Sequence, residues 1–108
     1  MNTDVRIDEF ASLFGEKRVR GTLKKMADIE ISHCRLNLDR AREALVPFEK
    51  RFRMKSEEAW EKYQQGELED DIEIMEWMGL YENFLAVADQ LQRIKNSRAY
   101  AELLSSAN

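Results

Sequence analysis

The sequence has few of the residues that end helices or link chains covalently. Its 108 residues include one proline, four glycines and one cysteine. So few turn formers exclude a many-stranded β-sandwich, and a hydrophobic content of 44% excludes intrinsic disorder. A single cysteine, Cys34, cannot form an intramolecular disulfide or a cysteine-based zinc site, and we interpret it as a small buried side chain.

The sequence also lacks a long apolar run and a signal-like N-terminus. No stretch is long enough to span a bilayer, and the first residues do not place basic residues before an apolar segment. We therefore predict a cytoplasmic protein that does not contact a membrane.

Charge of opposite sign is concentrated in the two halves of the chain. Residues 1–55 hold 13 Lys and Arg against 9 Asp and Glu, a net charge of +4, whereas residues 56–108 hold 4 against 12, a net charge of −8. This complementarity favours antiparallel pairing of the two halves, within a hairpin or between two chains. Because a chain of this length buries a modest core by itself, we also expect a homo-oligomer.

Hydrophobic residues recur at alternating intervals of three and four in two long segments, which is typical of helices that pack along a seam. The first seam comprises Ile31, Cys34, Leu38, Ala41, Leu45, Phe48 and Phe52. The second comprises Trp77, Leu80, Phe84, Val87, Leu91 and Ile94, and its apolar face is widened by Ile74, Met78, Tyr81 and Ala88. We predict that a second chain covers this wide face.

The resulting prediction is a single all-α domain. It is an antiparallel helical hairpin or coiled coil with a short helix at the elbow, assembling into a dimeric helical bundle. Its expected parts are a poorly defined segment 1–21 that contains one short helix, a long helix 22–52, a short helix 56–65, a long helix 70–96 and a frayed tail 97–108.

Polar and glycine residues mark the expected helix ends. Thr22 and Ser56 are suitable N-caps, and Gly66 can adopt the left-handed conformation that ends a helix. Pro47 lies off the seam, so we expect it to kink the first long helix without ending it.

A short basic segment holds Lys17, Arg18 and Arg20, which would suit contact with phosphate groups. The whole chain is acidic, however, with a net charge of −4, and no recognised DNA-binding pattern surrounds the segment. A solvated linker is the favoured interpretation, and nucleic-acid binding remains the alternative.

Glu30 and His33 have the Glu-x-x-His spacing of carboxylate-bridged di-metal helical bundles. Such a site also needs inward carboxylates from further helices, and both residues lie off the first seam. We therefore favour a surface histidine and predict no metal, no other cofactor and no catalytic residue.

Acidic and aromatic residues gather at the elbow and at the start of the last long helix. A stabilised helix start accounts for part of the acidic group but not for Glu73 and Glu76. The order of acidic residues is not that of a calcium loop, and a thin hairpin offers no cleft for hydrolysis by paired carboxylates. Recognition of a basic groove on another protein remains. Core packing is the favoured interpretation for Trp77, which lies on the seam, and an equal alternative for Trp60. The candidate partner-binding residues are Trp60, Tyr63, Glu69, Asp70, Asp71, Glu73, Glu76, Trp77 and Tyr81.

The elbow resembles that of small coiled-coil proteins regarded as antitoxins of archaeal and bacterial type II toxin–antitoxin modules. The resemblance covers about residues 45–90 and is carried by the core Gly66-Glu67-Leu68-x-Asp70-Asp71 followed by Glu76-Trp77. It implies a non-enzymatic protein that blocks a neighbouring toxin, often an RNA nuclease. The alternatives are a structural or adaptor coiled coil and, less favoured, a carboxylate metal protein.

Overall fold

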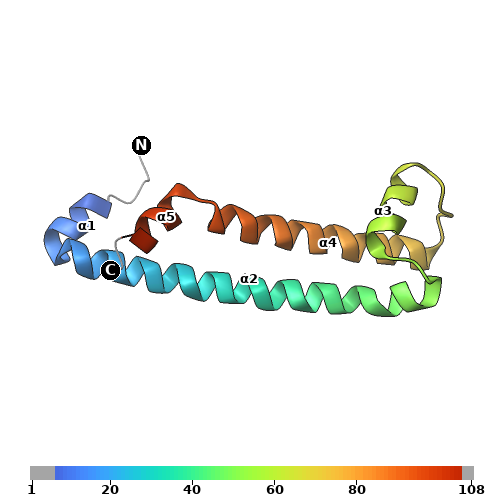
Figure 1. Ribbon diagram of the computed structural model, residues 1–108, viewed down its shortest axis with the longest axis horizontal. Helices are drawn as coiled ribbons and strands as arrows, with labels where there is room; N and C mark the ends of the chain where they lie inside the picture. Colours follow the sequence, from blue (N-terminus) through green and yellow to red (C-terminus); the bar gives the residue numbers. More distant parts are fainter. Residues whose placement is uncertain (1–6, 106–108) are drawn as a thin grey trace. The chain divides into compact units, whose positions relative to one another are not determined.

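Every regular element in the described part of the chain is a helix, as Figure 1 shows for the computed structural model, which describes residues 7–105. The prediction of an all-α fold is confirmed. The helices in chain order are α1 (Ile7–Phe14), α2 (Glu16–Phe52), α3 (Ser56–Gln64), α4 (Ile72–Lys95) and α5 (Arg98–Ser105).

The chain divides into two compact units. Within the described residues the first contains 7–32 and 92–105, so it includes α1, the start of α2, the end of α4 and α5. The second runs without interruption from His33 to Leu91 and contains the rest of α2, all of α3 and most of α4.

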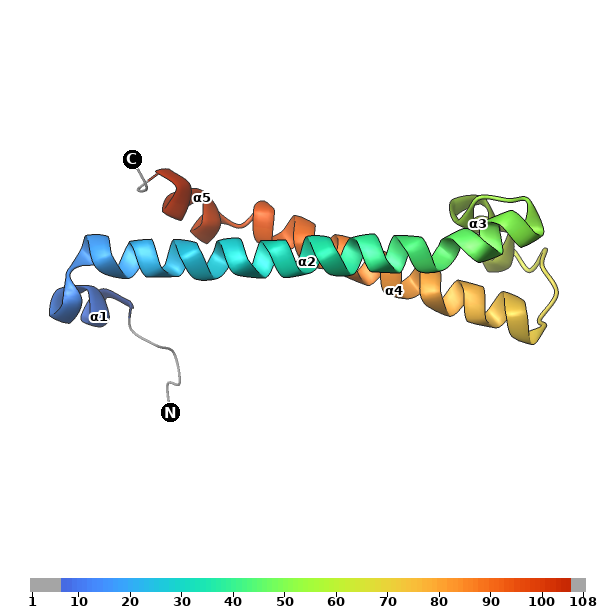
Figure 2. The same cartoon turned by 90° about the horizontal axis from the view of Figure 1, so that it is seen from below.

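The second unit is a helical hairpin in which α2 and α4 run antiparallel (Figures 1 and 2). The short helix α3 belongs to the segment that connects them. The rings of Phe48 and Phe52 stack on Trp77, with centroid distances of 6.1 and 5.2 Å. The two predicted seams therefore meet in this unit, and the helical hairpin is confirmed. The buried core draws on all three helices and comprises Leu45, Ala59, Ile74, Trp77, Met78 and Tyr81.

Helix α3 covers the wide apolar face of α4 in the second unit. Ala59 of α3 is fully buried against this core, and the ring of Trp60 lies 5.5 Å from that of Tyr81. The prediction that a second chain covers Ile74, Met78 and Tyr81 is therefore wrong. Local periodicity shows how wide an apolar face is, but it does not show which segment packs on it.

In the second unit, proline does not end its helix and glycine does, as the sequence predicts. Pro47 lies inside α2, which continues to Phe52, as predicted. Gly66 ends α3 with φ +74°, and Glu67 N–H donates to the carbonyl of Lys62 at 2.8 Å. This is the left-handed helix end predicted for Gly66, and it turns the chain toward α4.

The start of α2 differs from the prediction. The helix begins at Glu16, directly after Gly15 with φ +93°, and not at residue 22. Thr22 is therefore not an N-cap, and its hydroxyl donates to the carbonyl of Arg18 within the helix. The basic segment is not a linker but the first turns of α2, where Arg20 pairs with Glu16 at 3.0 Å.

The predicted frayed tail contains a capped helix, α5, in the first unit. Ser97 Oγ accepts a hydrogen bond from the N–H of Tyr100 and donates one to the carbonyl of Ile94. The hydroxyl of Tyr100 lies 3.4 Å from Asp28 of α2, and Asp28 pairs with Lys24 at 2.9 Å. Residues 106–108 of that predicted tail lie outside the described residues.

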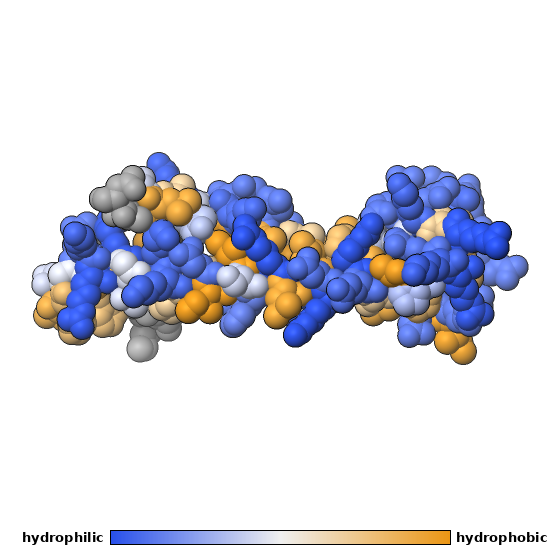
Figure 3. All heavy atoms as spheres, turned by 60° about the horizontal axis from the view of Figure 1, so that its bottom comes forward, coloured by the Kyte–Doolittle hydropathy of each residue, from blue (hydrophilic) through white to orange (hydrophobic). Residues whose placement is uncertain are grey.

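Apolar side chains are not confined to the interior. On the face drawn in Figure 3, hydrophobic residues reach the surface among hydrophilic ones. Even so, no helix in the described range combines the length and apolar character that crossing a membrane requires.

Candidate protein-binding surface

A buried hydrogen-bond network ties the three helices of the second unit together at Ser56. The carboxylate of Glu49 on α2 accepts bonds from the N–H and the hydroxyl of Ser56, at 2.9 and 2.8 Å. The indole N–H of Trp77 on α4 donates to Ser56 Oγ at 2.9 Å. Ser56 is fully buried and Trp77 is 1% exposed, so both residues of the Trp77–Ser56 hydrogen bond are shielded from water, whereas Glu49 is half-buried. Such shielding makes each of these bonds costly to lose.

This network corrects the predicted role of Ser56. Lys55 occupies the N-cap position of α3, in an extended conformation and without a side-chain cap, and Ser56 is the first helical residue. The cap is supplied from another helix, because Glu49 accepts the N–H of Ser56. A carboxylate at a helix N-terminus also interacts favourably with the helix dipole.

A second polar contact lies beside the network. The guanidinium of Arg42 on α2 pairs with Glu57 of α3 at 2.9 Å and lies 4.0 Å from Glu49. It also lies over the ring of Phe84 on α4, 5.5 Å from the centroid. Arg42 thus contacts both other helices of the second unit, which further fixes their positions.

The pKa of Glu57 lies below its ordinary value of 4.5. The main cause is hydrogen bonding to its own backbone N–H, with a further contribution from Arg42, while desolvation opposes both. A carboxyl group with a lowered folded-state pKa stabilises the fold above its unfolded pKa. That stabilisation is lost as the pH falls through the folded value.

We therefore expect Glu57→Gln to flatten the acid limb of the stability profile. The decrease in unfolding free energy from about pH 6 to about pH 3 should become measurably smaller, by up to about 1 kcal/mol and no more, because the Arg42–Glu57 pair is partly exposed. Urea unfolding at a series of pH values measures this, with Glu43→Gln on the exposed side of α2 as the control. Equal slopes for wild type and Glu57→Gln would contradict the assignment.

The predicted aromatic contact residues divide between core and surface. Trp77 and Tyr81 are buried in the core of the second unit, and burial raises the pKa of the Tyr81 hydroxyl. Neither side chain is available to a partner, so their predicted role in binding is not supported by their position. Trp60 and Tyr63 of α3 are half-buried, with ring centroids 6.4 Å apart, and both keep some exposed area.

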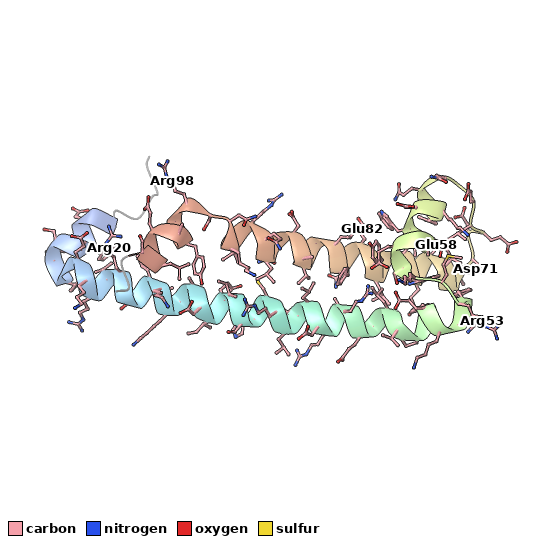
Figure 4. All side chains as sticks on the ribbon, viewed as in Figure 1. Arg20, Arg53, Glu58, Asp71, Glu82 and Arg98 are labelled. Carbon is pink, nitrogen blue, oxygen red and sulfur yellow. The ribbon has the colours of Figure 1, made fainter. Side chains whose placement is uncertain are left out.

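Two of the predicted acidic residues are used within the fold. Asp71 caps α4, since its Oδ1 accepts a hydrogen bond from the N–H of Ile74 at 2.8 Å; Figure 4 labels Asp71 where the loop enters the helix. Glu73 pairs with Arg51 of α2 at 2.9 Å. These carboxylates stabilise the start of α4, and their charge is partly compensated.

The remaining predicted acidic residues form a charged surface. Glu69, Asp70 and Glu76 are exposed, and none of them pairs with a cation anywhere in residues 7–105. They lie in the loop before α4 and in its first turns. Uncompensated carboxylates in so short a segment attract positively charged groups.

Sequence reasoning missed two apolar residues beside these carboxylates. Ile72 is 83% exposed and Met75 is 55% exposed. With Glu76 they lie on the face of α4 opposite the core residues Ile74 and Trp77. Their spacing places them off the second seam, and this is the feature of the sequence that could have indicated their exposure. We call Glu69, Asp70, Ile72, Met75 and Glu76 together the α4 acidic surface.

Carboxylates around exposed apolar side chains suit contact with a basic protein surface that also carries apolar groups. Comparisons with protein-family models, with curated proteins and with solved structures found no match. The α4 acidic surface therefore has to be interpreted from its own chemistry: charge for attraction, and Ile72 and Met75 for apolar contact area.

The alternative site at Glu30 and His33 gains no further ligand. Both residues are exposed on α2. Across residues 7–105 no group of three or more His, Cys, Asp or Glu side chains comes together in a way that could hold a metal ion.

Proposed function

We propose that this chain is a non-catalytic protein-binding module that neutralises a partner protein through the α4 acidic surface. The observation that carries the proposal is the exposure of Ile72 and Met75 among three carboxylates that lack an ion pair within the described residues. Large apolar side chains exposed next to uncompensated charge are typical of a contact surface.

The geometry favours binding because the helical part of the surface, with Ile72, Met75 and Glu76, is firmly anchored. Helix α4 is capped by Asp71, anchored to α2 through Arg51–Glu73, and fixed to α3 through the Trp77–Ser56 hydrogen bond. A surface presented on such a support loses little conformational entropy when a partner binds.

The partner that this surface suits is a basic protein. Carboxylates on a helical face can occupy a groove that otherwise binds phosphates, so an RNA-binding protein is a fitting target. The resemblance of the elbow to antitoxins supports a toxin with RNA nuclease activity as that target. A cytoplasmic location and a coiled-coil pairing of the long helices belong to the same proposal.

Co-expression with the product of the adjacent open reading frame tests the proposal. We expect that product alone to arrest growth and this chain to restore it. Reversing three charges in Glu69→Lys/Asp70→Lys/Glu76→Lys should abolish the rescue and weaken copurification at least about tenfold, because attraction becomes repulsion.

The matched control reverses three exposed carboxylates elsewhere in the second unit, in Asp39→Lys/Glu43→Lys/Glu82→Lys. This variant should rescue growth as the wild type does. If both triple variants rescue equally, the α4 acidic surface does not bind the partner, and a structural or adaptor role becomes the better interpretation.

A further inference from the structure

The first unit leaves an apolar groove open between α1 and the start of α2. Its volume is about 510 Å³, and its lining includes Phe10, Phe14, Val19, Leu23 and Met26. The rings of Phe10 and Phe14 stack at 6.0 Å, yet Phe14 is 57% and Met26 60% exposed. Covering such side chains gains free energy in proportion to the apolar area removed from water.

The groove has a basic edge. Arg18 lines it, and Lys25, one turn past Gly21, lies on the same stripe of α2. Neither cation pairs with an acidic residue in the described range, whereas Arg20 and Lys24 are paired with Glu16 and Asp28. Uncompensated positive charge thus remains at the groove.

We propose that the groove binds the α4 acidic surface of a second copy of this chain. The two surfaces match in apolar character and in charge. Ile72 and Met75 supply the apolar contact, and the neighbouring carboxylates face the cations Arg18 and Lys25. The proposed pair is twofold symmetric, so the groove of each copy contacts the α4 acidic surface of the other. Two linked contacts bind more tightly than one of the same size.

A glycine inside α4 agrees with a close approach at the α4 acidic surface. Gly79 lies on the same stripe of α4 as Ile72 and Met75. A Cβ added at Gly79 meets nothing within 4 Å, so packing within the chain does not require glycine there. Because glycine in a helix interior is unfavourable, a neighbouring chain is a physical reason for its presence.

The contact would use the surface assigned above to a partner protein, so a second copy and the partner would compete for it. The test of self-association uses the chain alone and therefore does not depend on that partner. The groove variant Arg18→Glu/Lys25→Glu leaves the α4 acidic surface unchanged. It should lose the dimer and keep growth rescue, which separates the two proposals.

Sedimentation equilibrium over a micromolar concentration series tests the contact. The wild type should reach twice the 12.7 kDa of one chain. Arg18→Glu/Lys25→Glu alone and Asp70→Lys/Glu76→Lys alone should each stay monomeric. An equimolar mixture of the two should recover the dimer, because each reversed groove then meets a reversed α4 surface. The control Arg35→Glu/Arg40→Glu, on exposed positions of the second unit, should dimerise as the wild type does.

A second variant separates contact from folding. Gly79→Ala should raise the thermal midpoint, because alanine favours a helix, while weakening the dimer at least about tenfold. A wild type that stays monomeric throughout the series overturns the proposal. So does a mixture of the two reversed variants that stays monomeric, or a Gly79→Ala variant that dimerises as tightly as the wild type.

Discussion

Trp77→Ala is expected to destabilise the protein by about 3–5 kcal/mol, the largest effect of any single change considered for this chain. The side chain is 1% exposed and stacks on Phe48 and Phe52, so its removal leaves a cavity between α2 and α4. It also leaves the buried hydroxyl of Ser56 without its donor. A small domain is stable by only about 5–15 kcal/mol in total, so this loss would remove a large share of the total stability.

Urea unfolding followed by far-UV circular dichroism measures this loss. Trp60→Ala is the matched control, because it makes the same chemical change at a half-buried position of α3. It should cost clearly less than the change at Trp77. Equal losses at the two positions would mean that Trp77 is not the centre of the core.

Glu49→Ala is expected to destabilise the protein by about 2–3 kcal/mol although the residue is polar. One oxygen of its carboxylate accepts both the N–H and the hydroxyl of the fully buried Ser56. Without it, the first turn of α3 loses its cap and two buried donors lose their acceptor. Glu49→Gln keeps an acceptor oxygen without the charge, so it should cost less than alanine.

Glu43→Ala provides the comparison for Glu49, since Glu43 is an exposed glutamate earlier on the same helix α2. Its effect on the unfolding free energy should stay within about 0.5 kcal/mol. Thermal and urea unfolding of the three variants measure the difference. A Glu49→Ala variant as stable as Glu43→Ala would show that the carboxylate does not hold α3 in solution.

The helices of the hairpin were predictable because one local pattern carries the information. Leu45, Phe48 and Phe52 recur at helical spacing on α2, and Trp77 belongs to the second seam, on α4. The two seams meet in the core, as that spacing predicts. Gly66 likewise marks the end of α3 through its own backbone freedom. Such features depend on residues a few positions apart, which a sequence displays directly.

The roles of Ser56 and Thr22 were not predictable from the same pattern. Serine is a residue type favoured at N-caps, but the partners of Ser56, Glu49 and Trp77, come from two other helices. Helix α2 begins at Glu16, directly after Gly15, and includes the basic segment before Thr22. Thr22, although a good capping residue, therefore lies inside the helix. Tertiary packing and an earlier helix start decided these positions against local preference.

The candidate binding surface was predictable only in part. Charge density marked Glu69, Asp70 and Glu76 in the sequence, and the structure leaves all three exposed. Trp77 and Tyr81 were also candidate contact residues, but both pack in the core, as the seam position of Trp77 favoured. Exposure of Ile72 could not be inferred from its type, because an isoleucine at a helix start is more often buried.

The hydrogen bond between Trp77 and the buried Ser56 closes the second unit and leaves the opposite face of α4 exposed. A double-mutant cycle with Ser56→Ala and Trp77→Phe, measured by urea unfolding, tests it most directly. We predict a coupling free energy of about 1 kcal/mol or more between the two positions. Additivity within about 0.3 kcal/mol would contradict the claim.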